Sequence, residues 1–269
     1  MIFHVPEVWI FTAFYGKIIG QVLDQYFKIY SRPVWSSRRV TIRFQYKCTK
    51  NSTRISMSPL PTQPKKLSLA VLISGTGRTL KNLLEHIASE TLAAEIRMVI
   101  ASTPHAKGLQ YAEQASIPIQ IVERQDFESR EDFSRSIFHC CDEADIDYVI
   151  LAGYIKLLEI PDNYKNRVLN IHPSLIPAFS GQGYYGDHVH EAVLRYGAKI
   201  TGCTVHFVDN EYDRGPVILQ RAIDVREDDD VTSLNDRVFE LERLVYPEAL
   251  QLLADGKIKV DGRIVQISK

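Results

Sequence analysis

The sequence contains little cysteine. Its 269 residues include only four, and Cys140 and Cys141 are adjacent while Cys48 and Cys203 lie far from them. This pattern excludes a disulfide scaffold and does not match the spacing of zinc ligands. We therefore expect a protein of a reducing compartment without a metal site.

Long hydrophobic runs are also missing. The most apolar stretch, residues 8–30, is interrupted by Lys17, Asp24 and Lys28 before it reaches the ~18 uncharged residues of a membrane span. A secretory signal is disfavoured because Glu7 stands where such signals carry positive charge. We therefore expect that the protein has no transmembrane helix and no membrane partner.

Acidic residues are absent between Asp24 and Glu85. Up to Lys66 the chain has 11 basic and 2 acidic residues, and from Leu67 onward it has 21 basic and 31 acidic residues. The net charge of −1 therefore averages a basic leader with an acidic remainder. A basic, serine-rich and acid-poor leader is typical of an organellar transit peptide.

Two alternatives remain for this leader. It is either an extension upstream of a start at Met57 or a basic arm that binds nucleic acid. The arm is disfavoured because only Phe44 and Tyr46 interleave with its charges and the remainder is acidic. We expect a leader and linker at 1–66, one domain at 67–269, no nucleic-acid partner, and a plastid or mitochondrial location, or a cytoplasmic one if the leader is not a transit peptide.

Short apolar runs alternate with amphipathic segments from residue 67 onward. This alternation predicts an α/β fold with a doubly wound, mostly parallel sheet. An Asp261-Gly262 turn between alternating runs predicts a C-terminal β-hairpin at 257–267. We expect strands at 67–74, 95–102, 117–122, 147–152, 167–171, 200–208 and 217–225, and helices at 79–89, 107–114, 129–143, 188–196 and 232–253.

A glycine loop, residues 74–80 (Ser-Gly-Thr-Gly-Arg-Thr-Leu), joins the first strand to the first helix. Its backbone N–H groups and the helix N-terminus favour an anion, and Thr79 is expected to cap the helix. Neither the Gly-Lys-Ser/Thr of a P-loop nor the third glycine of a dinucleotide fingerprint is present. The loop suits a phosphate monoester, although a tight turn without a ligand has the same pattern.

Asn170 and His172 lie two residues apart in a predicted strand that Pro173 ends, so both side chains point to one face at its carboxyl end. An amide donor can stabilise an oxyanion and an imidazole can transfer a proton, and acyl transfer needs both functions at one point. A carboxylate from the loop at 209–216, such as Asp213, is expected to raise the pKa of His172. His172 also fits a structural histidine, and Asp213 a turn residue.

Other histidines carry less information. His188 and His190 are two apart on a predicted helix and do not share a face. His206 lies within an apolar strand, which favours a role in the core or a role that supports the site over a catalytic one.

The segments 70–80, 147–158, 169–179, 202–217 and 237–247 closely resemble the phosphoribosylglycinamide formyltransferase family, and the resemblance covers 67–265 in the same order. It implies the formyltransferase fold, with 10-formyltetrahydrofolate as co-substrate, glycinamide ribonucleotide as acceptor and no metal. Two positions depart from the family pattern: Arg78-Thr79 replaces Ser-Asn, and Phe239 replaces a polar residue.

The resemblance also implies roles for individual residues. Asn170, His172 and Asp213 match the catalytic trio, in which Asn170 and protonated His172 hold the oxyanion of formyl transfer in purine biosynthesis and Asp213 keeps His172 charged. The family's positions that bind the ribonucleotide and its phosphate match Gly77, Arg78, Thr79 and Glu242. The family's positions that bind the folate match Arg130, Ile155, Lys156, Leu157, Leu158 and Asn170.

Three alternatives stay open. A formyltetrahydrofolate deformylase uses the same trio on water, but it needs an N-terminal domain with strands and helices that the leader does not show. A methionyl-tRNA formyltransferase needs a basic C-terminal domain. A nucleotide-binding module without catalysis is the third. Formyl transfer to another amine, a variant of the main prediction, also stays open. The sequence does not indicate the oligomeric state.

Overall fold

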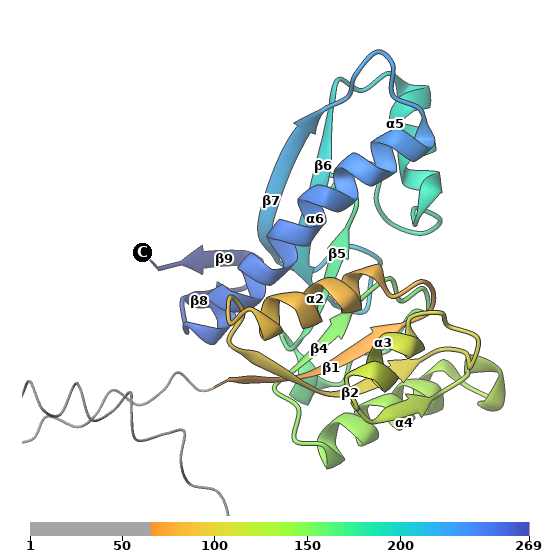
Figure 1. Cartoon of the computed structure of the whole chain (residues 1–269), viewed down its shortest axis with the longest axis vertical. Helices are drawn as coiled ribbons and strands as arrows, with labels where there is room; N and C mark the ends of the chain where they lie inside the picture. Colours follow the sequence, from red (N-terminus) through yellow and green to blue (C-terminus); the bar gives the residue numbers. More distant parts are fainter. Residues whose placement is uncertain (1–65, 269) are drawn as a thin grey trace, which may run out of the picture. The chain divides into compact units, whose positions relative to one another are not determined.

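A seven-stranded sheet organises residues 66–268, which are the residues that the computed structural model describes (Figure 1). The predicted leader lies outside this range. The elements, in chain order, are β1 (Leu67–Ile73), α2 (Arg78–Ala88), β2 (Ala94–Ala101), α3 (Leu109–Gln114), β3 (Ile119–Ile121), a 3₁₀ turn (Arg124–Asp126), α4 (Arg130–Glu143), β4 (Tyr148–Leu151), a second 3₁₀ turn (Asp162–Tyr164), β5 (Val168–His172), α5 (Asp187–Tyr196), β6 (Ile200–Phe207), β7 (Val217–Asp224), α6 (Val231–Ala254), β8 (Ile258–Asp261) and β9 (Ile264–Ile267).

The strand order of the main sheet is β3-β2-β1-β4-β5-β6-β7. Strands β1 to β5 pair in parallel, while β6 pairs antiparallel with β5 and β7 pairs antiparallel with β6. The chain order reverses at β1, which lies between β2 and β4. In open α/β sheets ligands bind beyond the carboxyl ends of the strands at such a reversal.

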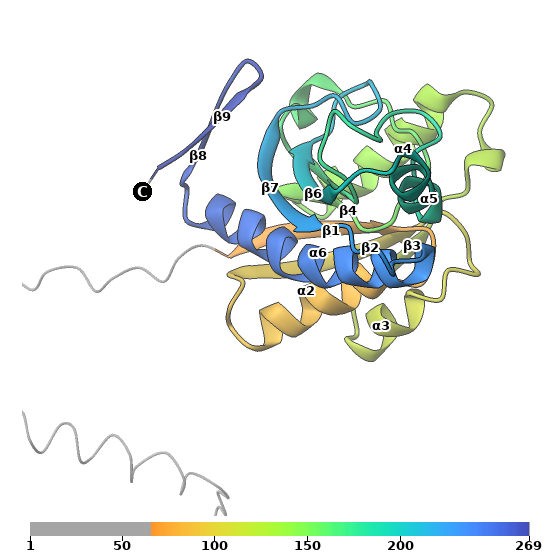
Figure 2. The ribbon, with the colours of Figure 1, turned by 90° about the horizontal axis from the view of Figure 1, so that it is seen from above.

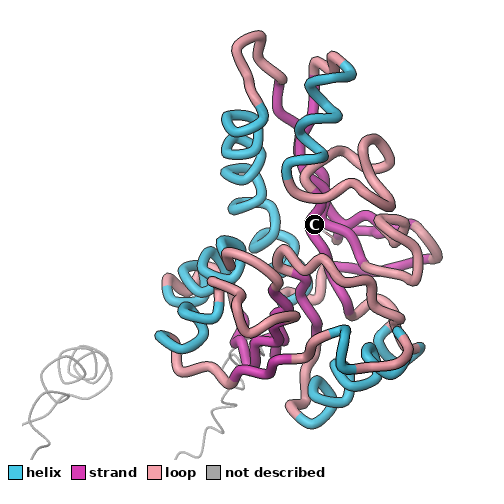
Figure 3. The backbone as a smooth tube through the Cα atoms, turned by 90° about the vertical axis from the view of Figure 1, so that its right-hand side faces the viewer, coloured by secondary structure: helices cyan, strands magenta, loops and turns pink. Residues whose placement is uncertain are grey.

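Helices cover both faces of the sheet, so its central strands β1, β4 and β5 are largely buried, while the edge strands β3 and β7 are partly exposed. One core contains Leu80 of α2, Val193 of α5 and Val238 of α6, and the other contains Phe133 and Ile137 of α4. Figure 2 shows α2 and α6 on one face and α4 on the other. Figure 3 shows the strands between the helices from the side.

The buried Tyr246 ties the long helix α6 to the sheet. Its hydroxyl donates to the carbonyl of Leu151, at the end of β4, and to that of Leu169 in β5, at 3.2 and 3.0 Å. This attachment places the α6 residues that precede Tyr246 over the carboxyl ends of the central strands.

The predicted fold class and the C-terminal hairpin of β8 and β9 are confirmed. The predicted cap is wrong: α2 begins at Arg78, and Gly77, not Thr79, is the N-cap residue. The left-handed conformation of Gly77 starts the helix two residues earlier than a side-chain cap at Thr79 would. None of the helices described is long and apolar enough to cross a membrane.

Gly77→Ala is expected to destabilise the domain. Gly77 has φ +72°, and an added Cβ would lie 2.4 Å from the Cα of Gly108, a backbone atom that cannot yield without moving the loop. The left-handed conformation alone costs an alanine about 1–2 kcal/mol. With the clash, we expect a loss of about 2 kcal/mol or more, which lowers the melting temperature by roughly 4–8 °C.

The control is Gly75→Ala in the same loop, because nothing lies within 4 Å of its added Cβ. Thermal unfolding followed by circular dichroism compares the two variants. Equal melting temperatures for both would contradict the close approach of Gly77 and Gly108.

Candidate active site

A cavity of about 380 Å³ opens at the carboxyl ends of β1, β4 and β5. Its wall includes residues 75–79 of the glycine loop after β1, the segment after β4 and the end of β5. The predicted site residues that line it are Gly77, Arg78, Thr79, Ile155, Lys156, Leu157, Leu158, Asn170, His172, Asp213 and Glu242.

Arg78 lies at the end of the cavity formed by the glycine loop and α6. Its guanidinium stacks on the ring of Phe239, with Cζ 3.9 Å from the ring centroid. Nη2 of Arg78 donates to Oδ1 of Asn235 at 3.0 Å, and Nη1 lies 3.5 Å from the exposed carboxylate of Asp236. The two departures from the family pattern, Arg78 and Phe239, are therefore in direct contact, with the guanidinium stacked on the ring.

Glu242 lines the same end of the cavity. Burial raises its pKa to about 8, and the nearby charge of Arg78 opposes this rise only partly. At neutral pH the protonated, uncharged form of the carboxyl group therefore predominates and does not repel an anion. A positive Arg78 beside a neutral Glu242 makes this end suitable for a phosphorylated ligand.

The segment after β4 forms the opposite end. Ser74, at the start of the glycine loop, connects the two ends: its Oγ accepts from the backbone N–H of Ile155 at 3.2 Å and from Oγ of Ser102 at 2.8 Å. Ile155 is 59% exposed and Leu158 is buried. An exposed apolar side chain beside backbone groups suits a flat heterocycle.

Asn170, His172 and Asp213 lie together in the wall of the same cavity. Nδ1 of His172 lies 3.5 Å from Oδ2 of Asp213, and Nε2 donates to the backbone carbonyl of Phe179 at 2.8 Å. Asp213 lines the cavity and Phe179 does not, so the neighbour that His172 shares with the cavity wall lies at its Nδ1 edge. The same Oδ2 accepts from the backbone N–H of Gly181 at 2.8 Å, which fixes the carboxylate.

The pKa of His172 is lowered, contrary to the rise expected from a neighbouring carboxylate. Burial is the main cause, and it outweighs Asp213 and the carbonyl of Phe179, which both favour the charged ring. Asp213 has a lowered pKa because His206, His172 and the N–H of Gly181 together outweigh its own burial. The ligand-free site therefore pairs a neutral imidazole with a carboxylate.

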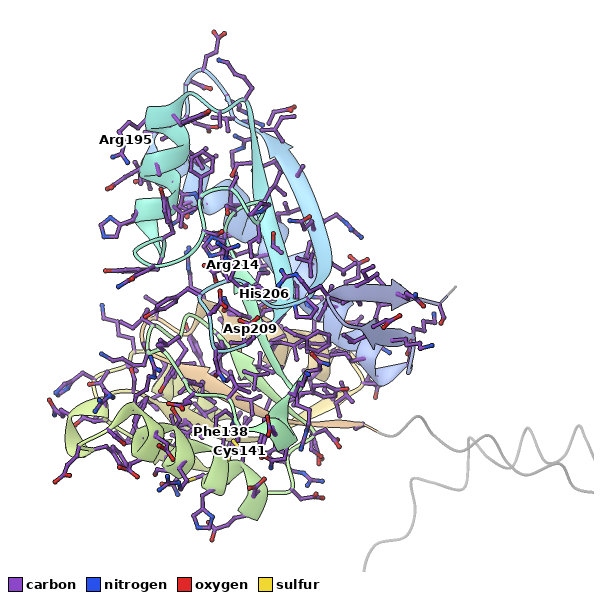
Figure 4. All side chains as sticks on the ribbon, turned by 180° about the vertical axis from the view of Figure 1, so that it is seen from behind. Phe138, Cys141, Arg195, His206, Asp209 and Arg214 are labelled. Atoms are coloured by element: carbon purple, nitrogen blue, oxygen red, sulfur yellow. The ribbon has the colours of Figure 1, made fainter. Side chains whose placement is uncertain are left out.

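His206 belongs to this site, although its place in an apolar strand favoured a core or supporting role. It lies opposite Asn170 in the antiparallel pairing of β5 with β6. Nδ1 of His206 donates to the carbonyl of Phe207 at 2.7 Å, and Nε2 lies 3.4 Å from Nδ2 of Asn170 and 3.7 Å from Oδ1 of Asp213. Figure 4 shows His206 near the centre of the molecule, with Asp209 and Arg214 on the loop that follows it.

Arg130 is the one predicted site residue that the structure places outside the cavity wall. It is the first residue of α4, and its Nε lies 3.6 Å from a carboxylate oxygen of Glu159 in an exposed pair. No group of three or more metal-ligating side chains is assembled within residues 66–268.

Several lining residues carry no motif of their own. They come from the loop between β5 and α5, from α5, from the acidic loop after β6 and from α6. They include Tyr184, Tyr185, His190, His206, Glu211, Tyr212, Asn235 and Phe239.

A doubly wound α/β fold with an Asn–His–Asp group beside a glycine loop defines the class: an α/β enzyme with a site of the acyl-transfer type. The family model described as formyl transferase matches residues 67–250. The chain belongs to this family, in its phosphoribosylglycinamide formyltransferase branch.

Three relatives illustrate the similarity. The chloroplastic phosphoribosylglycinamide formyltransferase of Arabidopsis thaliana is 34% identical over 200 residues, which are 73% of this chain and 68% of the plant protein. The trifunctional purine biosynthetic protein adenosine-3 of Gallus gallus is 38% identical over 200 residues, 74% of this chain, which spans only 19% of that longer protein. The crystal structure of glycinamide ribonucleotide transformylase 1 from Symbiobacterium toebii superposes with a TM-score of 0.73 and 36% identity, covering 80% of this chain and 100% of that one.

Proposed function

We propose that the protein transfers the formyl group of 10-formyltetrahydrofolate to the amine of glycinamide ribonucleotide in purine biosynthesis. The names of the relatives support this reaction. The observation that carries it is that Asn170, His172 and Asp213 share one cavity wall with the cation of Arg78 and with the exposed apolar side chain of Ile155. The phosphate of the ribonucleotide binds at the cationic end and the pterin of the folate at the apolar end.

In the proposed reaction, the amine of the ribonucleotide forms a bond to the formyl carbon and the formyl oxygen becomes negatively charged. One N–H of Asn170 points to His206, which leaves the second N–H for this oxygen. Nδ1 of His172 accepts the proton that the amine loses, and Asp213 stabilises the imidazolium. His172 then protonates the departing folate nitrogen, so that tetrahydrofolate leaves and the neutral ring returns.

The test is an absorbance assay of tetrahydrofolate release by the full chain, with and without glycinamide ribonucleotide. Release that depends on the ribonucleotide is expected. Release without any amine would identify a deformylase and overturn the proposal. Release only with a different amine would keep the formyl transfer and replace the acceptor.

Arg78→Ala is expected to raise the KM for the ribonucleotide by about 10- to 100-fold, because a hydrogen bond to a charged group contributes about 1.5–3 kcal/mol. Phe239→Leu removes only the cation–π contact, worth about 0.5–1 kcal/mol, and should raise the same KM about two- to fivefold. Steady-state kinetics at saturating folate measures both variants.

The KM for the folate is the internal control, because Arg78 lies at the opposite end of the cavity. Arg195→Ala on α5, a site outside the cavity wall, controls for loss of charge. A larger change in folate KM than in ribonucleotide KM would contradict the proposed orientation of the two substrates.

We infer that residues 1–66 form an organellar transit peptide and that 67–269 form the catalytic domain. The acid-free, basic composition supports this division, as do the plant relatives whose names say chloroplastic. Mass spectrometry of the protein from plastid and mitochondrial fractions tests it. Intact Met1 in the protein of these organelles would overturn it.

A further inference from the structure

His190 is a buried histidine of α5 to which the proposed mechanism assigns no role. It is 2% exposed and forms part of the cavity wall. Its Nδ1 is one of three buried side-chain atoms, among the described residues, that have no hydrogen-bond partner. Burying a polar atom without a partner costs free energy, so a ligand that supplies the partner recovers this free energy.

The position of His190 identifies the part of the cavity that it serves. It lies three residues after Asp187, so both residues occupy the same face of α5. Oδ1 of Asp187 accepts from Nδ2 of Asn235 at 2.8 Å, and Oδ1 of Asn235 accepts from Arg78 at 3.0 Å. This chain of hydrogen bonds attaches the first turn of α5 to the cationic end of the cavity. Figure 1 shows α5 beside α6, the helix that carries Asn235.

His190 is also close enough to His172 for the two rings to interact electrostatically, as it is to Arg78 and Asp187. It therefore borders both the phosphate end and the reaction centre. In a phosphoribosyl amine, the sugar ring connects the phosphate to the amine. A ribonucleotide that spans the two ends brings its ribose beside His190.

The charge of His190 favours a neutral partner. Burial lowers the pKa of His190, and His172 and Arg78 lower it further, while Asp187 opposes them. A neutral imidazole has one donor and one acceptor nitrogen, which matches a hydroxyl group better than a phosphate. Rotation about the Cβ–Cγ bond, a broad torsion in histidine, brings either nitrogen toward the cavity.

We propose that His190 is a substrate-binding residue whose imidazole forms a hydrogen bond with a ribose hydroxyl of the ribonucleotide. This inference rests on the proposed function and adds a specificity determinant to it. It predicts that the enzyme distinguishes ribonucleotides from their deoxyribose analogues through a histidine outside the catalytic trio.

The test is a cycle of two changes, one in the protein and one in the substrate. His190→Leu removes the hydrogen bond and keeps an apolar side chain of similar length. We expect the KM for glycinamide ribonucleotide to rise roughly tenfold, the size of one neutral hydrogen bond. With the parent enzyme, the 2′-deoxy or the 3′-deoxy analogue should show the same rise, and with His190→Leu that analogue should show no further rise.

Conservative variants separate binding from packing. The amide of His190→Asn reproduces the position of Nδ1 and that of His190→Gln the position of Nε2, so one of the two should restore most of the affinity. His188→Leu, on the exposed side of the same helix, should leave every KM unchanged. The KM for the folate and the melting temperature should stay close to the parent values in the restored variant.

Each outcome decides the proposal. If each deoxy analogue raised the KM by the same factor with the parent enzyme and with His190→Leu, the proposal would be overturned, because the ribose hydroxyls would then bind elsewhere. A fall in melting temperature with no recovery in either amide variant would assign His190 to packing alone. A parent enzyme without ribonucleotide-dependent turnover refutes the proposed function and this inference with it, whereas normal parent turnover with an unchanged KM in His190→Leu refutes only the inference.

Discussion

His172→Gln is expected to lower kcat by about 10²–10⁴, the contribution of a general acid–base group, because His172 accepts the proton of the amine and returns it to the folate nitrogen. Glutamine places an amide N–H near the position of Nε2, so it retains the hydrogen bond to the carbonyl of Phe179. It has no titratable nitrogen at the Nδ1 edge, which faces Asp213 at 3.5 Å. Kinetics with both substrates saturating measures the loss of the reaction step separately from binding.

His139→Gln is the matched control, because His139 is exposed on α4 and pairs only with Glu143. Its kcat should equal that of the parent. For His172→Gln, unchanged KM values and a similar melting temperature should accompany the loss of kcat. A kcat within threefold of the parent would remove His172 from the proposed mechanism.

The fold was predictable because its signals are local. Each buried strand is a short apolar run, and each helix shows an apolar stripe, as in α2, where Leu80 and Leu83 face the core. The start of α2 was missed because the sequence shows a capping residue at Thr79, while the observed start depends on the close approach of Gly77 to Gly108. That contact lies 31 positions away along the chain and leaves no local pattern.

The site was predictable only in part, for the same reason. Asn170, His172 and Asp213 lie at the ends of recognisable strands and carry polar chemistry. His206 looks like a core residue in its own strand, and only the antiparallel register of β6 against β5 brings it to Asn170. His190 and Phe239 become part of the site because α5 and α6 pack beside the glycine loop. The hydrophobic periodicity of the sequence does not specify this packing.

The domain from Leu67 onward is net acidic, with 31 acidic and 21 basic residues, so its overall field does not attract an anionic substrate. Local charges in the cavity instead make the binding of an anion favourable. Arg78 supplies a fixed cation over Phe239, and burial keeps Glu242 protonated, with a pKa of about 8, so that it adds no negative charge at neutral pH. The departure of Arg78 from the family pattern thus places a full positive charge where the phosphate is proposed to bind.

Asp213→Asn is expected to lower kcat by about 10², the lower end of the contribution of general acid–base groups. Asp213 has φ +54°, and asparagine also tolerates this left-handed conformation and still accepts from the N–H of Gly181. The substitution therefore removes mainly the charge. The carboxylate raises the pKa of His172 against its burial, so its loss lowers that pKa further and destabilises the imidazolium formed during transfer.

The sign of the pH effect distinguishes this role from a structural one. The base is neutral His172, so kcat falls on the acid side as the ring becomes protonated before the reaction. Lowering the pKa of His172 moves this acid limb to lower pH in Asp213→Asn, even though the plateau of kcat is reduced. Asp209→Asn, on the same loop but outside the cavity wall, should keep both the plateau and the limb. An acid limb that stays in place or moves to higher pH in Asp213→Asn would show that Asp213 does not act through the charge of His172.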